Sequence, residues 1–294
     1  MDFEKVKKAG EINSKAREYG KTLIVPGAKL SEVNDKITQF IRDQGAELAF
    51  PIVISCNNVA AHDSAKINED FVFNDEVVKL DMGVHIDGWI SDTAVTIDLS
   101  GKNQDLVDAS REALNNVIKI LKPGITLGQI GKVVEETITG KGFKPVKNLS
   151  GHQIGHYIVH TGLSIPNFDT GDNTELQAGM QFAIEPFASS GSGIVVEKGE
   201  SEIFSMIGYK PVRLPMVREV QNYLEKEVLL MPFSARMLTQ KFGESKTRIA
   251  LKIFKDNGTL RSYPPLVDKD GGLVSQAEHT FYIDEDWNVH ITTK

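Results

Sequence analysis

The sequence predicts an α+β domain built from two similar halves, with helices packed on a curved antiparallel sheet. The first observation is an internal repeat, in which apolar positions recur in the same order at an offset of 97 residues. The second is that each half passes from helix-like to strand-like sequence, which is typical of the α+β class. The third is a helix-like stretch that interrupts the strands of the second half.

The repeat is clearest in one predicted helix of each half. One copy has Leu23-Ile24-Val25-Pro26-Gly27 followed by Leu30, Val33, Ile37, Ile41 and Gly45, and the other has Ile120-Leu121-Lys122-Pro123-Gly124 followed by Leu127, Ile130, Val134, Ile138 and Gly142. The 3-4-4 spacing is one face of an amphipathic helix, and glycine often follows the last helical turn. A further helix is predicted before each turn, over residues 4–23 and 104–121.

Strands are predicted after these helices. Residues 71–97 alternate in polarity around Asp87-Gly88, a strong hairpin signal. Residues 181–188 and 274–283 are the matching strands of the second half. Residues 201–261 are predicted to be helical, over 217–230, 234–242 and 245–257, and resemble a winged-helix module. We therefore expect a main domain of residues 1–200 and 262–294, with an inserted subdomain of residues 201–261.

Composition limits the cellular setting. The 294 residues lack an amino-terminal apolar segment, so we expect no signal peptide, and they lack the run of about 18 apolar residues that would predict a membrane span. Cys56 is the only cysteine, which excludes an internal disulfide and suits a reducing compartment. A cytoplasmic monomer is the starting expectation.

Charge is unevenly distributed along the chain. The net charge of −7 argues against nucleic acid as a specific ligand of the whole surface. Residues 201–261 contain eleven Lys and Arg against six Asp and Glu, a net charge of +5, which leaves −12 for the remainder. The predicted insertion is therefore a basic module on an acidic body.

Two aspartates of the predicted hairpin are expected to face each other. A two-residue turn at Asp87-Gly88 places Gly83 opposite Asp92, and Asp81 lies two residues from Gly83 on the same face. Asp is depleted in strands, and two carboxylates ~4 Å apart repel by about 4 kcal/mol at an effective dielectric constant of 20. A bound cation would make this arrangement favourable. The alternative is that Asp92 faces solvent.

The second half repeats the pattern of carboxylates. Aligning the halves places Glu185 on Asp81, and Glu278, in the return strand, then corresponds to Asp92. His152 falls opposite Ser55 in the repeat and can therefore reach the midline between the halves. His156 and His160 follow His152 at a spacing of four, and surface or structural roles are preferred for His85, His156, His279 and His290.

Four carboxylates and one neutral imidazole carry a charge of −4, which two divalent cations balance. Oxygen-rich ligation favours Mn²⁺, Fe²⁺ or Co²⁺ and leaves Zn²⁺ open, whereas the Cys-rich ligands of a structural zinc site are absent from the sequence. Two such ions about 3.5–4 Å apart can hold and deprotonate a bridging water, which is the chemistry needed to hydrolyse an amide.

At these residues the sequence resembles the methionine aminopeptidases, whose pita-bread fold is shared with prolidase and aminopeptidase P. The resemblance covers almost the whole chain, and the inserted helical segment is similar to that of the type II, archaeal-type members. The motifs that carry it are Ala60-Ala61-His62, Leu80-Asp81-Met82-Gly83, Ser91-Asp92-Thr93, Ser150-Gly151-His152, Val159-His160, Ala183-Ile184-Glu185-Pro186 and Ala277-Glu278-His279-Thr280.

The resemblance implies a role for each matched position. Asp81 would bind one metal ion, His152 and Glu185 the other, and Asp92 and Glu278 both. His62 and His160 would contact substrate and stabilise the tetrahedral intermediate, and Glu185 would also carry the proton of the nucleophilic water. Phe50 and Val159 would line the methionine pocket, to which Met231-Pro232-Phe233-Ser234 is the nearest match in the insertion.

The implied activity is removal of the initiator methionine from nascent proteins, with a preference for a small second residue. The alternatives are an X-Pro dipeptidase or aminopeptidase P, which usually carries a separate amino-terminal domain, and a non-catalytic relative that binds protein or nucleic acid. The basic insertion also suggests a transient contact with the ribosome.

Overall fold

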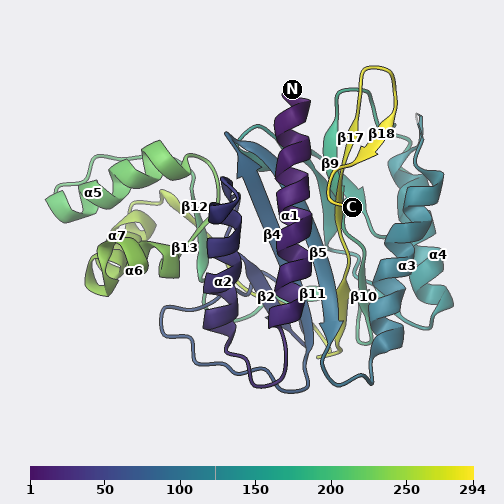
Figure 1. The fold of residues 1–294 in the computed structure, drawn as a ribbon, viewed down its shortest axis with the longest axis horizontal. Coiled ribbons are helices and arrows are strands. Elements are labelled where there is room, and N and C mark those ends of the chain that lie inside the picture. The colour runs from purple at the N-terminus through teal and green to yellow at the C-terminus, as the bar shows by residue number, and fades with distance from the viewer. Residues whose placement is uncertain (123) are drawn as a thin grey trace.

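The computed structural model describes residues 1–122 and 124–294 and contains two halves, each of which begins with two helices and continues with strands (Figure 1). The first half contains α1 (Phe3–Leu23), α2 (Leu30–Asp43), β1 (Glu47–Leu48), β2 (Val53–Cys56), β3 (Val59–Ala61), β4 (Val77–Ile86) and β5 (Trp89–Asp98). The second half contains α3 (Gln104–Ile120), α4 (Leu127–Gly140), β6 (Lys144–Pro145), β7 (Ser150–Gly155), β8 (Ile158–Pro166), β9 (Gln181–Ile184), β10 (Phe187–Ser189), β11 (Val195–Glu197), β15 (Leu266–Asp268), β16 (Val274–Gln276), β17 (His279–Ile283) and β18 (Val289–Ile291).

The predicted repeat is present in the backbone. Helices α2 and α4 begin and end 97 residues apart, as do the first residues of β2 and β7. Gly45 and Gly142, which follow the two helices, have φ angles of 77° and 83°, in the left-handed region that glycine adopts without strain. Of the two predicted Pro-Gly turns, the second includes Pro123, which lies outside the described residues.

The β4–β5 hairpin has the predicted register. Ile86 pairs with Trp89 and Gly83 with Asp92, across a turn in which Asp87 and Gly88 have positive φ angles of 47° and 81°. This turn matches the right-handed twist of the strands, which is why Asp-Gly favours a tight hairpin. The strand itself begins only at Val77, later than the alternation from residue 71 suggests.

The strands of the second half are less regular than the sequence predicts. β9 gives way to β10 at Glu185-Pro186, and β16 gives way to β17 at Ala277-Glu278. Proline has no N–H to donate to a strand ladder, which accounts for the first interruption. Each of the two predicted strands is therefore divided into two shorter strands. Glu185 lies at the first interruption and Glu278 at the second.

The break also changes the register of one carboxylate. The ladder pairs on either side place Glu278 directly across from Glu185, whereas Asp92 is diagonal to Asp81. In the first half the residue directly across from Asp81 is Ala94, so Glu278 corresponds to Ala94 and not to Asp92 when Glu185 is aligned with Asp81. The predicted correspondence between Glu278 and Asp92 is therefore wrong by two positions. Because successive side chains alternate between faces, a shift of two keeps Glu278 on the same face.

Residues 203–263 form a helical cluster beside the first half, at the left of Figure 1. It contains β12 (Ile203–Met206), α5 (Pro215–Tyr223), a π-helical turn η1 (Leu224–Val228), β13 (Phe233–Ser234), α6 (Ala235–Phe242), α7 (Glu244–Asp256) and β14 (Leu260–Tyr263). The second and third predicted helices are confirmed. The first begins at Pro215 and continues beyond Tyr223 as the π-helical turn η1, which ends at Val228, two residues before the predicted end. The cluster also contains three short strands for which no residue ranges were predicted, and β12 pairs with both β13 and β14. These strands are too short for alternation to reveal them.

Helices cover the outer face of each half. α1 packs across β4 and β5 with α2 beside it, and α3 and α4 cover the second half (Figure 1). Separate apolar clusters fill the two helix–sheet interfaces. In the described part of the chain, no helix has the length and apolar character needed to cross a bilayer.

Asn13 of α1 provides a test of this packing, because it is fully buried and its amide donates to the carbonyl oxygens of Met82 (2.8 Å) and Ser91 (3.0 Å). Asn13→Ala should lower the free energy of unfolding by about 2 kcal/mol, since both hydrogen bonds are lost. Urea denaturation measures the change. Glu11→Ala, on the exposed face of the same helix, is the control and should cost less than about 0.5 kcal/mol. Equal losses would contradict this account.

Candidate metal centre

A cavity of about 490 Å³ opens where the two halves meet the 203–263 cluster. Its wall includes nine residues that the sequence predicts for the site: Phe50, His62, Asp81, Asp92, His152, Val159, His160, Glu185 and Glu278. These residues span more than two hundred positions of the chain. The fold therefore brings all five predicted metal ligands and the two predicted substrate histidines to one place.

The facing edges of two sheets position the carboxylates. Ala94 of β5 forms an isolated antiparallel bridge with Glu278, and the Thr93 hydroxyl donates to the Glu278 carbonyl oxygen at 2.9 Å. The Thr280 hydroxyl accepts from the backbone N–H of Asp92 and lies 2.7 Å from the Asp92 carbonyl oxygen, to which it donates. Backbone contacts thus hold Asp92 and Glu278 together across the interface between the halves.

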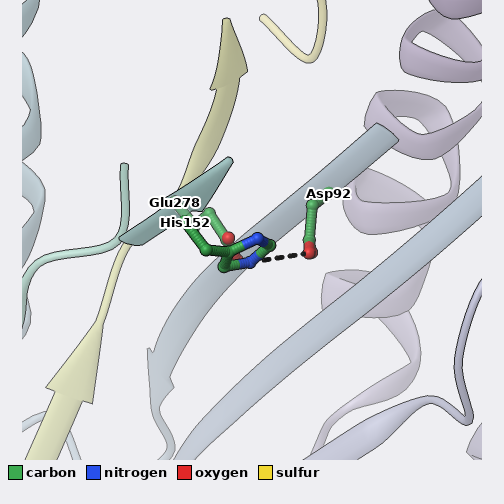
Figure 2. A group of neighbouring side chains, drawn as sticks. All are labelled: Asp92, His152 and Glu278. Atoms are coloured by element: carbon green, nitrogen blue, oxygen red, sulfur yellow. Dashed lines mark ion pairs between the residues drawn. The ribbon is translucent and has the colours of Figure 1, made fainter. Parts of the chain in front are cut away.

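His152 projects from β7 toward this group (Figure 2). Its Nε2 lies 3.5 Å from Asp92 Oδ2 and 4.0 Å from Glu185 Oε1. Potential ligand atoms of Asp92, His152 and Glu278 lie within 4.8 Å of one another. The predicted repeat accounts for this position, because His152 pairs with Ala183 as Ser55 pairs with Lys79 in the first half.

The carboxylates are strongly perturbed by burial and by one another. Burial raises the pKa of Asp92 to about 8. Burial, with the added negative charge of Asp92, raises the pKa of Asp81 well above its ordinary value, and the pKa values of Glu185 and Glu278 rise for the same reasons. Burial lowers the pKa of His152 to about 4, which leaves a neutral imidazole at pH 7.

The unpaired atoms of this cluster indicate what would neutralise it. Asp81 Oδ1, Asp92 Oδ1 and both carboxylate oxygens of Glu278 are buried without a hydrogen-bond partner among the described residues. Each buried polar atom left unpaired costs roughly 1–3 kcal/mol. Oxygen donors with one neutral imidazole are ligands for divalent metal ions, so a metal fits both the charge and the unpaired atoms.

Gln276 belongs to this centre and was not predicted. It is 1% exposed, and its Nε2 donates to Asp81 Oδ2 and to Glu185 Oε2, each at 3.2 Å. The amide therefore orients two carboxylates from different halves. The sequence does contain a feature that could have identified Gln276. It lies two residues before Glu278, and residues two apart in a strand point to the same face.

His62 and His160 add neutral imidazoles to the cavity. The His160 ring lies against His152, with centroids 4.0 Å apart, and the pKa of His160 is lowered by burial and by neighbouring His152 and His62. His62 Nδ1 is 3.3 Å from the Pro264 carbonyl oxygen, so Nδ1 donates and Nε2 remains an acceptor while burial lowers the His62 pKa. Its φ of 64° is a strained conformation of the kind found at functional sites.

Apolar side chains complete the cavity. Phe50 and Val159 are present as predicted, together with Ile203, Met206, Ile207, Leu230 and Pro232. An added Cβ at Gly83 would lie 2.2 Å from Phe50 Cε1, so the glycine allows this ring to lie beside the carboxylates.

Of the four residues of the insertion that the sequence suggests for the methionine pocket, only one lies in the wall of the cavity. Of Met231-Pro232-Phe233-Ser234, Pro232 lines the cavity, whereas Met231 and Phe233 pack in the apolar core of the 203–263 cluster. The pairing of β13 with β12 turns Phe233 inward. The residues of β12 were missed because their position depends on pairing with the distant β14.

Comparison with known proteins agrees with this geometry. The model of metallopeptidase family M24 matches residues 4–221. The chain is 43% identical over 293 residues to the methionine aminopeptidase of Methanocaldococcus jannaschii and 42% identical over 292 residues to that of Archaeoglobus fulgidus, covering 99% of this chain and 98% of the relative in both cases. The solved methionine aminopeptidase of Thermotoga maritima matches with a TM-score of 0.71 and 25% identity, covering 99% of this chain and 96% of that chain. The predicted pita-bread fold is confirmed.

The raised pKa values predict how pH changes stability and metal binding. The pKa of Asp92 is about 8 in the folded state and about 4 in the unfolded state. Between these two pH values the folded state holds a proton that the unfolded state has lost, so the free energy of unfolding falls as pH rises. The fall is at most about 1.4 kcal/mol per pH unit for this one group. Since Mn²⁺ must displace that proton, the rise in Tm caused by Mn²⁺ should be larger at about pH 8 than at about pH 5.5.

Thermal unfolding with and without Mn²⁺ at the two pH values measures this effect. Asp92→Asn is the control, because an amide has no proton to lose in this range, and it should reduce the pH dependence to the part that Asp81, Glu185 and Glu278 contribute. An Mn²⁺-induced shift of the same size at both pH values in the unmodified protein would contradict the assignment.

Proposed function

We propose that this chain, which belongs to metallopeptidase family M24, removes the initiator methionine from newly made proteins. One observation carries the proposal: four carboxylates, of which Asp92 and Glu278 are buried and Asp81 and Glu185 half-buried, meet His152 in a cavity whose wall also contains a group of apolar side chains. The first part suits metal-assisted hydrolysis of an amide, and the second suits an unbranched apolar side chain. The identity to methionine aminopeptidases over 99% of the chain supports this choice over an X-Pro peptidase or a non-catalytic relative.

We assign two divalent cations to the centre, with Co²⁺, Mn²⁺, Fe²⁺ and Zn²⁺ as candidates. Asp81 would hold one ion, His152 and Glu185 the other, and Asp92 and Glu278 both. The short separations among Asp92, His152 and Glu278 support the shared position, and two ions match four carboxylate charges. Bound cations would supply Lewis acidity, which polarises the peptide carbonyl and acidifies water.

The side chains would do the remaining work. Glu185, with its raised pKa, would accept a proton from the attacking water and deliver it to the departing amine. His160, which is neutral, would donate a hydrogen bond to the substrate carbonyl oxygen as negative charge develops on it. His62, whose Nε2 is an acceptor, would bind a substrate N–H and so hold the peptide in place for the transition state. We therefore assign both histidines to contacts with the substrate rather than to metal binding.

The apolar wall would select methionine. Burying the side chain against Phe50 and Val159 gains about 0.8 kcal/mol per methylene, and a thioether adapts well to an irregular pocket. The free α-amine would point toward the carboxylates, which restricts cleavage to the first peptide bond. A narrow passage beyond that bond would favour a small second residue.

We also propose the setting in which the enzyme acts. Residues 1–200 and 262–294 would be the catalytic domain, and residues 201–261 an inserted subdomain, supported by the separate small sheet of β12, β13 and β14. We take the enzyme to be a cytoplasmic monomer, in keeping with the free thiol of Cys56.

Hydrolysis of Met-Gly-Met-Met tests the activity. We expect release of methionine that stops when metal is removed by a chelator and returns when Co²⁺ or Mn²⁺ is added. His152→Ala should lower kcat/KM by roughly 100-fold or more, since loss of even an outer-shell metal contact typically costs 10–100-fold. Free methionine measured by chromatography is the readout.

The matched control is His290→Ala. His290 lies on β18, and its imidazole is paired with Asp284, so its removal should leave turnover unchanged. Preferential cleavage of X-Pro peptides would favour the prolidase alternative. Metal-independent turnover would refute the metallopeptidase mechanism in this chain. Absence of turnover with any of the four metals would favour a binding role.

We also propose that the basic 203–263 cluster makes a transient contact with the ribosome. Helices α6 and α7 carry Arg236, Lys241, Lys246, Lys252 and Lys255, of which Arg236 is occupied because its Nη2 lies 2.7 Å from Asp35 Oδ2 on α2. Lys246 pairs with Glu219. Lys241, Lys252 and Lys255 are exposed to solvent, with Lys252 paired to Asp256 at 3.0 Å and the Lys241 ammonium 4.5 Å from the Tyr223 ring centroid.

Replacing Lys241, Lys252 and Lys255 by Gln should weaken co-sedimentation with ribosomes and lower its salt dependence by about two units of log–log slope, as expected for three lost phosphate contacts. The control replaces Lys36, Lys119 and Lys132, exposed on α2, α3 and α4, and should behave like the unmodified protein. Equal co-sedimentation of both triple variants would remove the proposal.

A further inference from the structure

The tips of two hairpins meet at one end of the molecule, away from the metal centre. The β4–β5 hairpin turns at Asp87-Gly88, and the β7–β8 hairpin turns at His156-Tyr157. We call the contact between them, made by His85, Asp87, Gly88, Trp89, His156 and Tyr157, the tip clamp. Neither sequence motif nor predicted function accounts for it.

Direct hydrogen bonds hold the clamp. The Tyr157 backbone N–H donates to the Gly88 carbonyl oxygen at 2.9 Å, and His156 Nε2 donates to the Asp87 carbonyl oxygen at 2.7 Å. The Gly88 N–H in turn donates to His85 Nδ1 at 3.1 Å. The β7–β8 turn thus supplies two donors, and the β4–β5 turn supplies the two carbonyl oxygens that accept from them.

Ring packing adds to these bonds. The His156 ring lies 4.5 Å from the Trp89 ring, centroid to centroid, at an interplanar angle of 31°. The Tyr157 ring covers Gly88 so closely that an added Cβ there would lie 2.3 Å from Tyr157 Cδ2. Gly88 is consequently buried, although it stands at a hairpin tip where exposure is usual.

The backbone of Tyr157 is strained. Its φ of 58° lies in the left-handed region, which costs a non-glycine residue of order 1–3 kcal/mol and persists only where surrounding contacts impose it. The contacts with Gly88 are those that impose it. A turn formed for the hairpin alone would be better served by Asn or Gly at this position.

The two clamped hairpins carry most of the metal centre. β4 and β5 supply Asp81 and Asp92, and β7 supplies His152, yet β5 and β7 belong to different sheets. From the tip, Asp92 is three residues along β5 and His152 four residues along β7, roughly 10–13 Å at 3.3 Å per residue. The tip clamp is therefore one of the contacts between these two sheets, together with the hydrogen bonds of Thr280 to Asp92, and it is the contact that involves the β7–β8 turn.

We propose that the tip clamp sets the position of His152 relative to Asp92, with His156 and Tyr157 acting as positioning residues for the metal centre. The inference rests on the proposed function, since it requires that His152 and Asp92 serve one cation site. Metal affinity is the property that responds, because a ligand displaced by a fraction of an ångström must be drawn back at the expense of binding.

Co²⁺ titration of the metal-free protein tests the proposal. His156 is exposed, so His156→Ala should fold normally while losing both the bond to Asp87 and the Trp89 contact. We expect ~10-fold weaker binding at the site that includes His152, in the range seen for outer-shell changes at metal sites. His156→Gln retains a donor near the position of Nε2 and should recover most of that loss. Tyr157→Ala should weaken binding at least as much as His156→Ala.

Two further measurements separate positioning from general stability. The paramagnetically shifted imidazole N–H resonance of Co²⁺-bound His152 should move in His156→Ala, and saturating Co²⁺ should recover most of the lost turnover. The control is Lys5→Met, which removes the 2.8 Å ion pair with the Asp87 carboxylate outside the clamp and should match the unmodified protein.

The inference would be overturned if His156→Ala and Tyr157→Ala both bound Co²⁺ with the affinity of the unmodified protein and both left the His152 resonance unmoved. This holds whatever the unfolding temperatures of the two variants. Failure of His156→Gln to recover any affinity would overturn the hydrogen bond as its cause. An unmodified protein in which Co²⁺ produces no His152 resonance would instead refute the proposed metal centre, which keeps the two failures distinct.

Discussion

Mutual repulsion among four carboxylates, two buried and two half-buried, is the constraint on which this molecule depends. Asp92 and Glu278 are each 2% exposed, and the pKa of every member of the set is raised by burial and, for three of them, by neighbouring negative charge. Such a cluster is unfavourable unless protons or cations neutralise it. Its persistence requires a scaffold that holds the groups together in spite of the repulsion.

The scaffold does this with threonine hydroxyls between the halves. Thr93 and Thr280 bond the backbone beside Glu278 and Asp92, and the Thr96 hydroxyl both donates to the Gln276 carbonyl oxygen and accepts from its N–H. Because these bonds hold backbone atoms, Asp92 Oδ1 and both carboxylate oxygens of Glu278 keep no hydrogen-bond partner among the described residues. The scaffold therefore resists charge repulsion without using the groups needed for binding.

Much of the fold and most of the centre could be predicted from sequence because the relevant signals are local or repeated. The Asp87-Gly88 turn determines the register of Asp92, and the 97-residue offset places His152. Glu278 was assigned to the correct face but the wrong register, since a strand break at Pro186 leaves no periodic signal. Gln276, the strands of the 203–263 cluster and the apolar wall were missed, because their positions arise from pairing between distant segments.

The bond between Arg236 and Asp35 has a consequence for how the protein can change. It ties the 203–263 cluster to α2, whereas the carboxylates and His152 all come from the duplicated halves. The wall of the cavity therefore has two origins, because Phe50 and Val159 come from the duplicated halves whereas Ile203, Ile207 and Leu230 come from the cluster. Substitutions at the latter three positions would change the shape of the cavity without altering the carboxylates or His152.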